Sequence, residues 1–276
     1  MITYSDIGHF GRLGNQMFQF ASTYGIANKL GYEVCFPIEN SEIASVESFK
    51  DGITREVYFD LPKVFELRDS ILRSRGDIST SYTVQEPHFH FTEQLFSIPD
   101  NCDLRGYYQT EKYFEHCKQD ILDLFTFKSQ IKSEAVEKMP ITNCDRVSIH
   151  VRLGDYLGLQ QFHPVCDSDY YVQASQNFTD DIYHFVIFSD NIDHCKNMFG
   201  ESENISYIEG NTAEVDMCMM SMCEHNIIAN SSFSWWAAWL NTNPFKKVIA
   251  PKKWFGPAYD GINDTKDLYC QNWIIV

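Results

Sequence analysis

The pattern of hydrophobic and polar positions is most regular in the second half of the chain. There, short runs of branched and aromatic residues, typical of buried strands, alternate with segments whose apolar positions recur at helical spacing. The sequence predicts strands at 147–151, 183–188, 205–208, 226–229 and 247–250, and helices at 167–178, 191–199, 214–223 and through Trp235, Trp236 and Trp239. This alternation predicts a parallel, doubly wound α/β sheet.

The first half opens in a similar way. A short strand within residues 2–7 is followed by the turn Gly11-Arg-Leu-Gly-Asn-Gln16 and by residues 17–30, which have helical period and stop at Gly31. Because residues 34–36 then predict a second strand, the opening is similar to a nucleotide-binding half-domain. It has neither Gly-x-Gly-x-x-Gly nor a Walker Lys-Ser/Thr, and a tight turn between strand and helix is the alternative interpretation.

The part between these two patterns is harder to interpret. Residues 40–100 are polar and mixed, although 88–91 alternate as in a strand. Residues 104–114 predict a strand that turns into a helix, the helix continues to about 138, and 140–145 has the features of a linker. The sequence therefore predicts two domains, at 1–140 and 141–276.

Composition excludes several classes of protein. The net charge of −16 argues against a nucleic-acid binder, because phosphate backbones are held by basic surfaces. The nine cysteines include no Cys-x-x-Cys pair, which favours reduced, buried thiols. The N-terminus has no signal-peptide pattern, and no apolar run approaches the roughly 18 residues of a membrane span. We therefore expect a cytoplasmic protein.

Candidate chemistry lies where two of the predicted strands end. The strand at 147–151 runs into Arg152, Gly154 and Asp155, and ligands of open α/β sheets bind beyond the carboxyl ends of strands. An Arg–Asp pair that only stabilises the turn is an equally good interpretation of this stretch alone. The strand at 226–229 stops at Asn230-Ser231-Ser232, residue types that start helices, and free N–H groups at a helix start bind anions. A guanidinium and a helix start together fit a diphosphate.

Other stretches admit both a functional and a structural interpretation. His88 and His90 could bind a metal from one strand face, but no third ligand is evident, so we expect no metal site and favour aromatic packing. The segment 104–114, with three tyrosines and Arg105, could bind a sugar by ring stacking or could be ordinary core.

Taken together, five motifs resemble the α-1,2-fucosyltransferases of glycosyltransferase family eleven. They are Gly11-Arg-Leu-Gly-Asn-Gln-Met-Phe-Gln19, Arg105-Gly-Tyr-Tyr-Gln-Thr-Glu-Lys-Tyr-Phe114, His150-Val-Arg-Leu-Gly-Asp-Tyr156, Phe188-Ser-Asp190 and His225-Asn-Ile-Ile-Ala-Asn-Ser-Ser-Phe-Ser-Trp-Trp236. They span nearly the whole chain in the family's order, whereas about 40–100 has no match.

The resemblance implies a GT-B-like α/β fold of two Rossmann-like halves with mostly parallel sheets, an acceptor-side domain at 1–140 and a donor-binding domain at 141–276. It implies an inverting galactoside 2-alpha-L-fucosyltransferase that uses GDP-L-fucose and a galactose-containing glycan, without a metal or other cofactor. Arg152 would bind the diphosphate, Asp190 would face the guanine or ribose, and Asn15 would lie near the transferred sugar or the acceptor. The expected catalytic residues are Arg152 and Asp155. The expected substrate-binding residues are Asn15, Gln16, Tyr107, Gln109, His150, Ser189, Asp190, Asn230, Ser231, Ser232 and Phe233.

Leu153 departs from the family pattern, which often has a second Arg there. Because side chains alternate along a strand, residues 152 and 153 should point to opposite sides, so the phosphate contact should be spared. The sequence does not identify the catalytic base: Asp155 is a candidate, but holding Arg152 is an equally good role for it.

Two alternative functions fit the same motifs. One is fucosyl transfer to a different acceptor, such as protein O-fucosylation, which the missing secretory signal argues against. The other is a non-catalytic GDP-sugar or glycan-binding domain, because a fold does not guarantee an activity.

Overall fold

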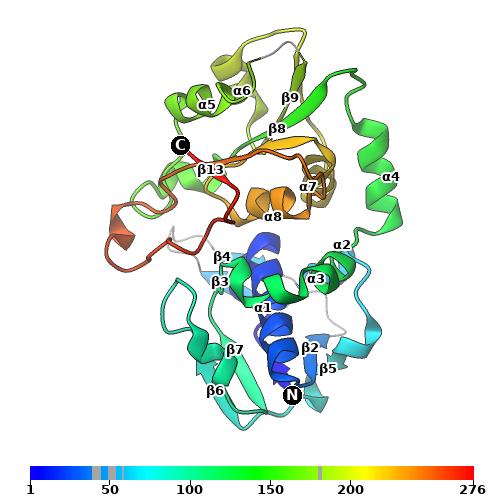
Figure 1. Cartoon of the computed structure of the whole chain (residues 1–276), viewed down its shortest axis with the longest axis vertical. Helices are drawn as coiled ribbons and strands as arrows, with labels where there is room; N and C mark the ends of the chain where they lie inside the picture. Colours follow the sequence, from blue (N-terminus) through cyan, green and yellow to red (C-terminus); the bar gives the residue numbers. More distant parts are fainter. Residues whose placement is uncertain (39–44, 49–53, 58, 180–181) are drawn as a thin grey trace. The chain divides into compact units, whose positions relative to one another are not determined.

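The computed structural model describes residues 1–38, 45–48, 54–57, 59–179 and 182–276 (Figure 1). They form two compact units, Met1–Lys128 with Gly261–Cys270 and Ser129–Asp260 with Gln271–Val276. Each unit has a parallel sheet with helices, which confirms the predicted fold class of two α/β halves. Part of the stretch 40–100, in which the sequence alone showed no motif of the family, lies outside the described residues.

The first unit is built on a five-stranded parallel sheet in the order β5-β2-β1-β7-β6. Its strands are β1 (Ile2–Thr3), β2 (Val34–Ile38), β5 (Leu72–Ser74), β6 (Tyr82–Gln85) and β7 (Cys102–Arg105), and a separate antiparallel pair is formed by β3 (Ser45–Ser48) and β4 (Thr54–Val57). Its helices are α1 (Leu13–Leu30), α2 (Leu61–Val64) and α3 (Lys118–Leu124), with short 3-10 turns at Asp69–Ile71, Arg75–Asp77, Glu93–Ser97, Glu111–Tyr113 and Glu115–Cys117. The long predicted helix α1 is confirmed and ends at Gly31.

Two local predictions between residues 88 and 138 are wrong. Residues 88–91 do not form a strand: the rings of His88 and His90 stack at 4.3 Å, and His90 lies near Asp264. The continuous helix predicted up to about 138 is broken into short turns, α3 and α4 (Ser129–Lys138).

The units divide the chain after residue 128, whereas the sequence predicted a boundary after residue 140. The reason is that α4 packs against α7 (Ala213–Met222), and Lys138 Nζ donates to Asn211 Oδ1, just before α7, at 2.8 Å. Residues 140–145 therefore lie within the second unit. Conversely, residues 261–270 belong to the first unit, in which Asp267 accepts hydrogen bonds from Phe91 N at 3.1 Å and Lys112 Nζ at 2.6 Å.

The second unit contains a six-stranded parallel sheet in the order β10-β9-β8-β11-β12-β13. Its strands are β8 (Asp145–Val151), β9 (Tyr183–Ser189), β10 (Ile205–Tyr207), β11 (His225–Ile227), β12 (Val248–Ala250) and β13 (Ile274–Ile275). Its helices after α4 are α5 (Ser168–Ser175), α6 (Ile192–Phe199), α7 and α8 (Ser232–Leu240), with 3-10 turns at Gly154–Gly158 and Pro257–Tyr259. The chain winds outwards from β8 to β10 and then returns to the other side of β8 at β11, so the strand order reverses between β8 and β11.

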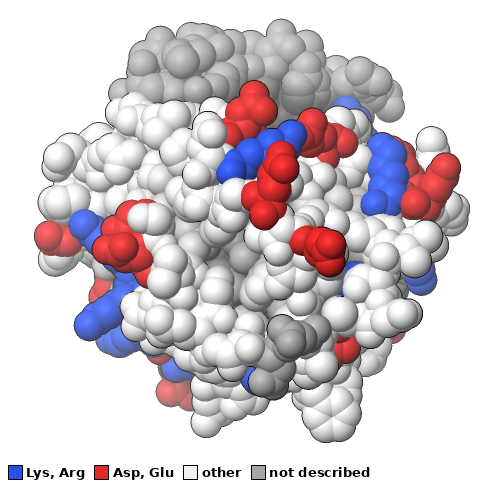
Figure 2. Space-filling model, turned by 90° about the horizontal axis from the view of Figure 1, so that it is seen from above, with Lys and Arg blue, Asp and Glu red and all other residues white. Residues whose placement is uncertain are grey.

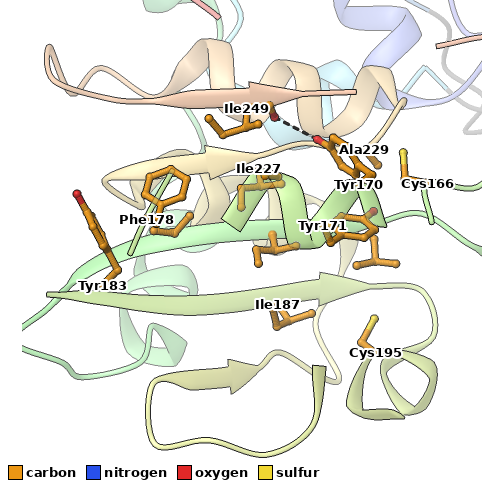
Figure 3. Close-up of a cluster of buried hydrophobic side chains, with 14 of the residues drawn as sticks. Cys166, Tyr170, Tyr171, Phe178, Tyr183, Ile187, Cys195, Ile227, Ala229 and Ile249 are labelled. Carbon is orange, nitrogen blue, oxygen red and sulfur yellow. Dashed lines mark hydrogen bonds between the residues drawn. The ribbon is translucent and has the colours of Figure 1, made fainter. Parts of the chain in front are cut away.

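One face of this sheet is covered by α5 and α6, and the other by α7 and α8 (Figure 1). Figure 3 shows the core under α5, in which Tyr170 and Tyr171 pack over Ile187, Ile227 and Ile249. The Tyr170 hydroxyl donates to the carbonyl oxygens of Ile228 at 2.5 Å and Ile249 at 3.3 Å. The buried tyrosines therefore fix α5 on the sheet and satisfy their own polar ends.

Alternation along β8 separates its core face from its other face. Val147, Ile149 and Val151 all belong to the core cluster under α5. On the opposite face, Ser148 accepts a hydrogen bond from Asn226 Nδ2 at 2.7 Å, next to α7. His150 shares that opposite face by its place in the alternation.

Candidate active site

The candidate site of the second unit lies where its strand order reverses. Arg152 directly follows β8, and Asn230 and Ser231 follow the neighbouring strand β11. In sheets of this kind the ligand crevice lies beyond the carboxyl ends of the two strands at the reversal. The rings of His150, on β8, and Phe233, in the first turn of α8, lie 5.6 Å apart. The fold thus brings together the two strand ends that the sequence singled out.

The predicted start of the helix after Asn230 is confirmed. Helix α8 begins at Ser232, and Ser231 is its N-cap with an extended backbone. The first turn of this nine-residue helix contains no acidic or basic side chain. A helix start leaves backbone N–H groups that can bind an anion. The helix start is where the sequence predicted it, and the binding of an anion there stays a prediction.

Arg152 is held between two carboxylates. Its Nη1 donates to Asp190 Oδ2 at 2.5 Å, and its Nη2 forms an ion pair with Asp155 Oδ1. Asp190 Oδ1 also accepts the backbone N–H of Leu153 at 3.0 Å, and the Tyr156 ring lies 5.3 Å from the guanidinium. The role of Asp155 as a holder of Arg152 is therefore realised in the structure, whereas its role as a base stays a prediction. A bound diphosphate would have to compete with these carboxylates.

The imidazole of His150 is a neutral group beside this cation. Burial and the nearby Arg152 charge lower its pKa to about 3. The side chain is only 6% exposed, and its Nδ1 has no hydrogen-bond partner among the described residues. A buried polar atom is normally paired, so this nitrogen can form a hydrogen bond with a bound ligand.

Leu153 lies where alternation predicted it. It is 1% exposed and belongs to the core cluster under α5, whereas the Arg152 side chain points away from that cluster to Asp155 and Asp190. The apolar residue in place of the family's second Arg is therefore a core residue here, and it leaves the contacts of Arg152 intact.

Ser189 and Asp190, at the end of β9, border an open depression of about 380 Å³. Its lining includes four carboxylates, Asp190, Asp193, Glu209 and Asp216. Burial raises the pKa of Asp216 to about 6, although Asn211 Nδ2 donates to it at 2.9 Å. Asp216 was not predicted from the sequence, because nothing in the Met-rich segment around it signals a site.

The side chain of Asn230 contacts other parts of the protein, although the sequence predicted that it contacts the ligand. Its side chain is 1% exposed and donates to the carbonyl oxygens of Pro164 at 2.8 Å and Trp254 at 3.0 Å. Its backbone oxygen accepts the Tyr156 hydroxyl at 3.2 Å. The side chain thus ties together the loops around the crevice.

The ring of Tyr156 stacks on His163 at 5.0 Å, and His163 lies 5.8 Å from Phe255 and 6.0 Å from Tyr259. This half-buried aromatic group adjoins Arg152. No sequence pattern signals this group, because its members come from two loops almost one hundred residues apart in the chain.

The remaining predicted residues lie in the first unit, where the strand order reverses between β1 and β7. Asn15, in the first turn of α1, accepts a hydrogen bond from Gln109 Nε2 at 2.8 Å. Gly11 has φ +92°, and a Cβ there would lie 2.1 Å from Asn15 Nδ2, so the turn requires glycine. The two predicted residues are therefore brought together from different loops.

Gln16 and Tyr107 differ in exposure. Gln16 is fully buried and its Oε1 accepts the backbone N–H of Asp60 at 2.9 Å, which is a structural contact. Tyr107 is 44% exposed. None of the predicted site residues has been tested by a bound ligand, so their roles stay predictions.

Several ion pairs join charges of opposite sign in the second unit. Arg146 with Glu224, Arg152 with Asp155 and Lys196 with Glu209 form ion pairs. On the face shown in Figure 2, Lys and Arg side chains lie beside Asp and Glu side chains. Across the described ranges, no group of three His, Cys, Asp or Glu residues is placed to hold a metal ion. No helix in the described part of the chain is both long and apolar enough to cross a membrane.

Sequence comparisons agree with the motifs. The model of Glycosyl transferase family 11 matches residues 2–276. The chain is 31% identical over 272 residues to the Alpha-1,2-colitosyltransferase of Escherichia coli, covering 89% of this chain and 90% of that protein. It is 28% identical to the O-antigen biosynthesis glycosyltransferase WbnK of Escherichia coli, covering 96% and 97%. It is 25% identical to Galactoside alpha-(1,2)-fucosyltransferase 1 of Homo sapiens, covering 92% of this chain and 73% of that protein.

Two solved structures share the fold. NodZ alpha-1,6-fucosyltransferase soaked with GDP-fucose has a TM-score of 0.53 at 13% identity, covering 87% of this chain and 91% of that chain. POFUT1 in complex with GDP has a TM-score of 0.54 at 13% identity, covering 90% and 97%. These likenesses confirm the predicted GT-B-like fold class. With a family model that matches almost every residue, the chain belongs to glycosyltransferase family 11.

Proposed function

We propose that this chain transfers L-fucose from GDP-L-fucose to O2 of a galactoside, with inversion at the sugar carbon. The single observation that supports this most is that Arg152 and the start of α8 follow the neighbouring strands β8 and β11, at the strand reversal of the second unit. The named α-1,2-transferases among its relatives support the linkage. The structures of NodZ and POFUT1 with GDP-fucose or GDP support a guanosine nucleotide.

The proposed chemistry follows from the charge that the reaction develops. When the bond between the sugar and the phosphate breaks, negative charge grows on GDP and positive charge on the sugar ring. A guanidinium matches two phosphate oxygens, and the N–H groups at the start of α8 add further donors. Groups of this kind, fixed in advance and aimed at developing charge, are worth roughly 3–4 kcal/mol each.

Asp155 and Asp190 would position Arg152 until GDP binds. A phosphate that displaces one carboxylate leaves the other to hold the guanidinium, so the cation stays oriented during the reaction. Ser189 and Asp190 would then border the guanosine, in the acidic depression at the end of β9. Guanine and ribose offer hydrogen-bond donors, which carboxylates accept.

The acceptor would bind to the first unit, at the pair formed by Asn15 and Gln109 with the exposed Tyr107. Amide side chains donate to and accept from sugar hydroxyls, and the tyrosine ring can stack on a sugar face. Independence from metals and a cytoplasmic location remain predictions of the sequence.

A colitosyl donor is a second candidate, because the Alpha-1,2-colitosyltransferase is 31% identical to this chain. We would measure GDP release and product linkage with GDP-fucose, or with GDP-colitose, and a panel of galactosides including lactose. The proposal expects an α-1,2-linked fucosyl product, and none from Arg152→Ala. Faster turnover of GDP-colitose would favour the second candidate. Tight GDP-fucose binding without turnover of any galactoside would indicate a binding domain.

A further inference from the structure

The loop that follows β7 is held by one carboxylate, that of Glu86. Glu86 directly follows β6, which pairs with β7 so that Gln85 lies opposite Arg105. Its Oε2 accepts the backbone N–H of Tyr107 at 2.7 Å, and its Oε1 accepts that of Tyr108 at 2.9 Å. The Glu86 N–H in turn donates to the Arg105 carbonyl at 2.7 Å. Both oxygens of one side chain are therefore used to fix two consecutive residues of the loop.

The loop has a backbone that needs such support. Gly106 has φ +151° and Tyr108 has φ +52°, a region that costs a residue with a side chain about 1 kcal/mol or more. A Cβ on Gly106 would lie 2.3 Å from Glu86 Cβ, so the carboxylate reaches the loop only because residue 106 is glycine. The buried Tyr108 ring adds a second anchor through its hydroxyl, which donates to the Arg105 carbonyl at 3.0 Å.

The supported loop presents two of the residues expected to meet the acceptor. Tyr107 is exposed, and Gln109 donates from Nε2 to Asn15 Oδ1. A displacement of the backbone at Tyr107 and Tyr108 would move both side chains relative to α1. Glu86 thus controls the spacing of the pair formed by Gln109 and Asn15.

We propose that Glu86 is a positioning residue for the sugar acceptor: its ionised carboxylate holds residues 106–109 so that Tyr107, Gln109 and Asn15 bind a galactoside. This inference rests on the proposed function, and it adds a residue that the motifs did not single out, together with a dependence of acceptor binding on pH.

The ionisation of Glu86 falls near neutral pH. Burial raises its pKa to about 7, against the effect of the two backbone N–H donors. The phenols that face this region, Tyr4, Tyr108 and Tyr113, have pKa values raised by burial and stay neutral. The guanidinium of the adjacent Arg105 is bound by Asp6 at 3.2 Å and Asp103 at 2.9 Å. Glu86 is therefore the group of this cluster that titrates around pH 7.

Acceptor binding and folding stability should respond to this ionisation with opposite signs. A protonated carboxyl group gives up acceptor capacity to its O–H, so the loop should loosen as pH falls through about 7. Because the pKa in the folded state is above the usual value, the contribution to folding stability is full below about pH 4.5 and is lost as pH rises through about 7. If Glu86 had only a structural role, a fall in pH would not weaken acceptor binding while it stabilises the fold.

The test compares Glu86→Gln with wild type and with the control Glu115→Gln, a change of an exposed carboxylate in the same unit. Glutamine keeps the shape but offers one oxygen, so one loop N–H loses its acceptor. With GDP-fucose and lactose, or the best galactoside of the panel, we expect the acceptor KM to rise about fivefold or more, the scale of one lost hydrogen bond. The donor KM should stay within about twofold, and the pH dependence of the acceptor KM near pH 7 should disappear.

Hydrogen–deuterium exchange at the Tyr107 and Tyr108 amides gives a readout that does not depend on turnover. In wild type, the exchange rate, corrected for the intrinsic pH dependence of amide exchange, should rise as pH falls through about 7. In Glu86→Gln the corrected rate should be high at every pH. If wild type turns over no galactoside, the proposed function is wrong. If Glu86→Gln has the exchange rates and the acceptor KM of wild type, Glu86 is not a positioning residue. Equal changes in both KM values, or a lower kcat with an unchanged acceptor KM, would also overturn it. If Glu86→Gln does not fold, the test uses wild type alone: an acceptor KM that does not change between about pH 6 and 8 would overturn the role of Glu86.

Discussion

Replacement of Arg152 by lysine is the most informative perturbation of the donor site. Both terminal nitrogens of its guanidinium are in use, one on Asp190 and the other on Asp155. A lysine keeps the charge, but its single ammonium group cannot hold one carboxylate and still bridge two phosphate oxygens. The substitution therefore removes the geometry of the contact and preserves its charge.

The expected size follows from that geometry. Loss of one well-aimed donor to developing charge costs about 2.7 kcal/mol, which is roughly a 10²-fold fall in kcat/KM. Arg152→Ala should be nearly inactive. Both variants should fold, because the side chain is 18% exposed and lies outside the core cluster under α5.

The assay is the release of GDP from GDP-fucose in the presence of a galactoside, with the melting temperature measured in parallel. Arg146→Lys is a matched control: this arginine is on the same strand, near its amino end, and contacts Glu224 at 2.7 Å and 3.0 Å. We expect the control to lose some stability and to keep kcat/KM within about twofold. A folded Arg152→Lys variant that retains more than about half of wild-type activity would show that Arg152 is a structural residue.

Three further predictions concern the acceptor, the helix start and metals. Gln109→Ala should raise the acceptor KM more than the donor KM, because its amide meets Asn15 at 2.8 Å; equal changes in both, or a loss of thermal stability alone, would favour a packing role. Ser232→Ala should weaken GDP binding by about 1 kcal/mol in calorimetry, the scale of one neutral hydrogen bond, and an unchanged affinity would count against a diphosphate at this position. Activity should survive EDTA, whereas loss with recovery on adding Mn²⁺ would overturn metal independence.

Hydrophobic periodicity was sufficient for five of the six strands of the second sheet, whereas the two-residue strand β13 was missed. The run 147–151 became β8, its alternation placed Leu153 in the core, and the helix after Asn230 began as predicted at Ser232. These features depend on local burial patterns, which a sequence shows directly.

The features that the sequence missed depend on pairing between distant segments. Glu86 follows a short, largely exposed strand with no clear pattern, and its role exists only because β6 pairs with β7. Asp190 reaches Arg152 because β9 pairs with β8, with Ser189 opposite Val151. At residues 88–91, the alternation of polar and apolar residues predicted a strand that is not formed. Such alternation reflects the surroundings of side chains and does not show that the backbone pairs with another strand.

A structure of this protein with GDP bound would test the proposed donor site directly. We predict that the diphosphate contacts the Arg152 guanidinium and the N–H groups at the start of α8, and that the guanosine lies at the end of β9 beside Asp190. A diphosphate bound more than a residue's length from both Arg152 and Ser232 would contradict it.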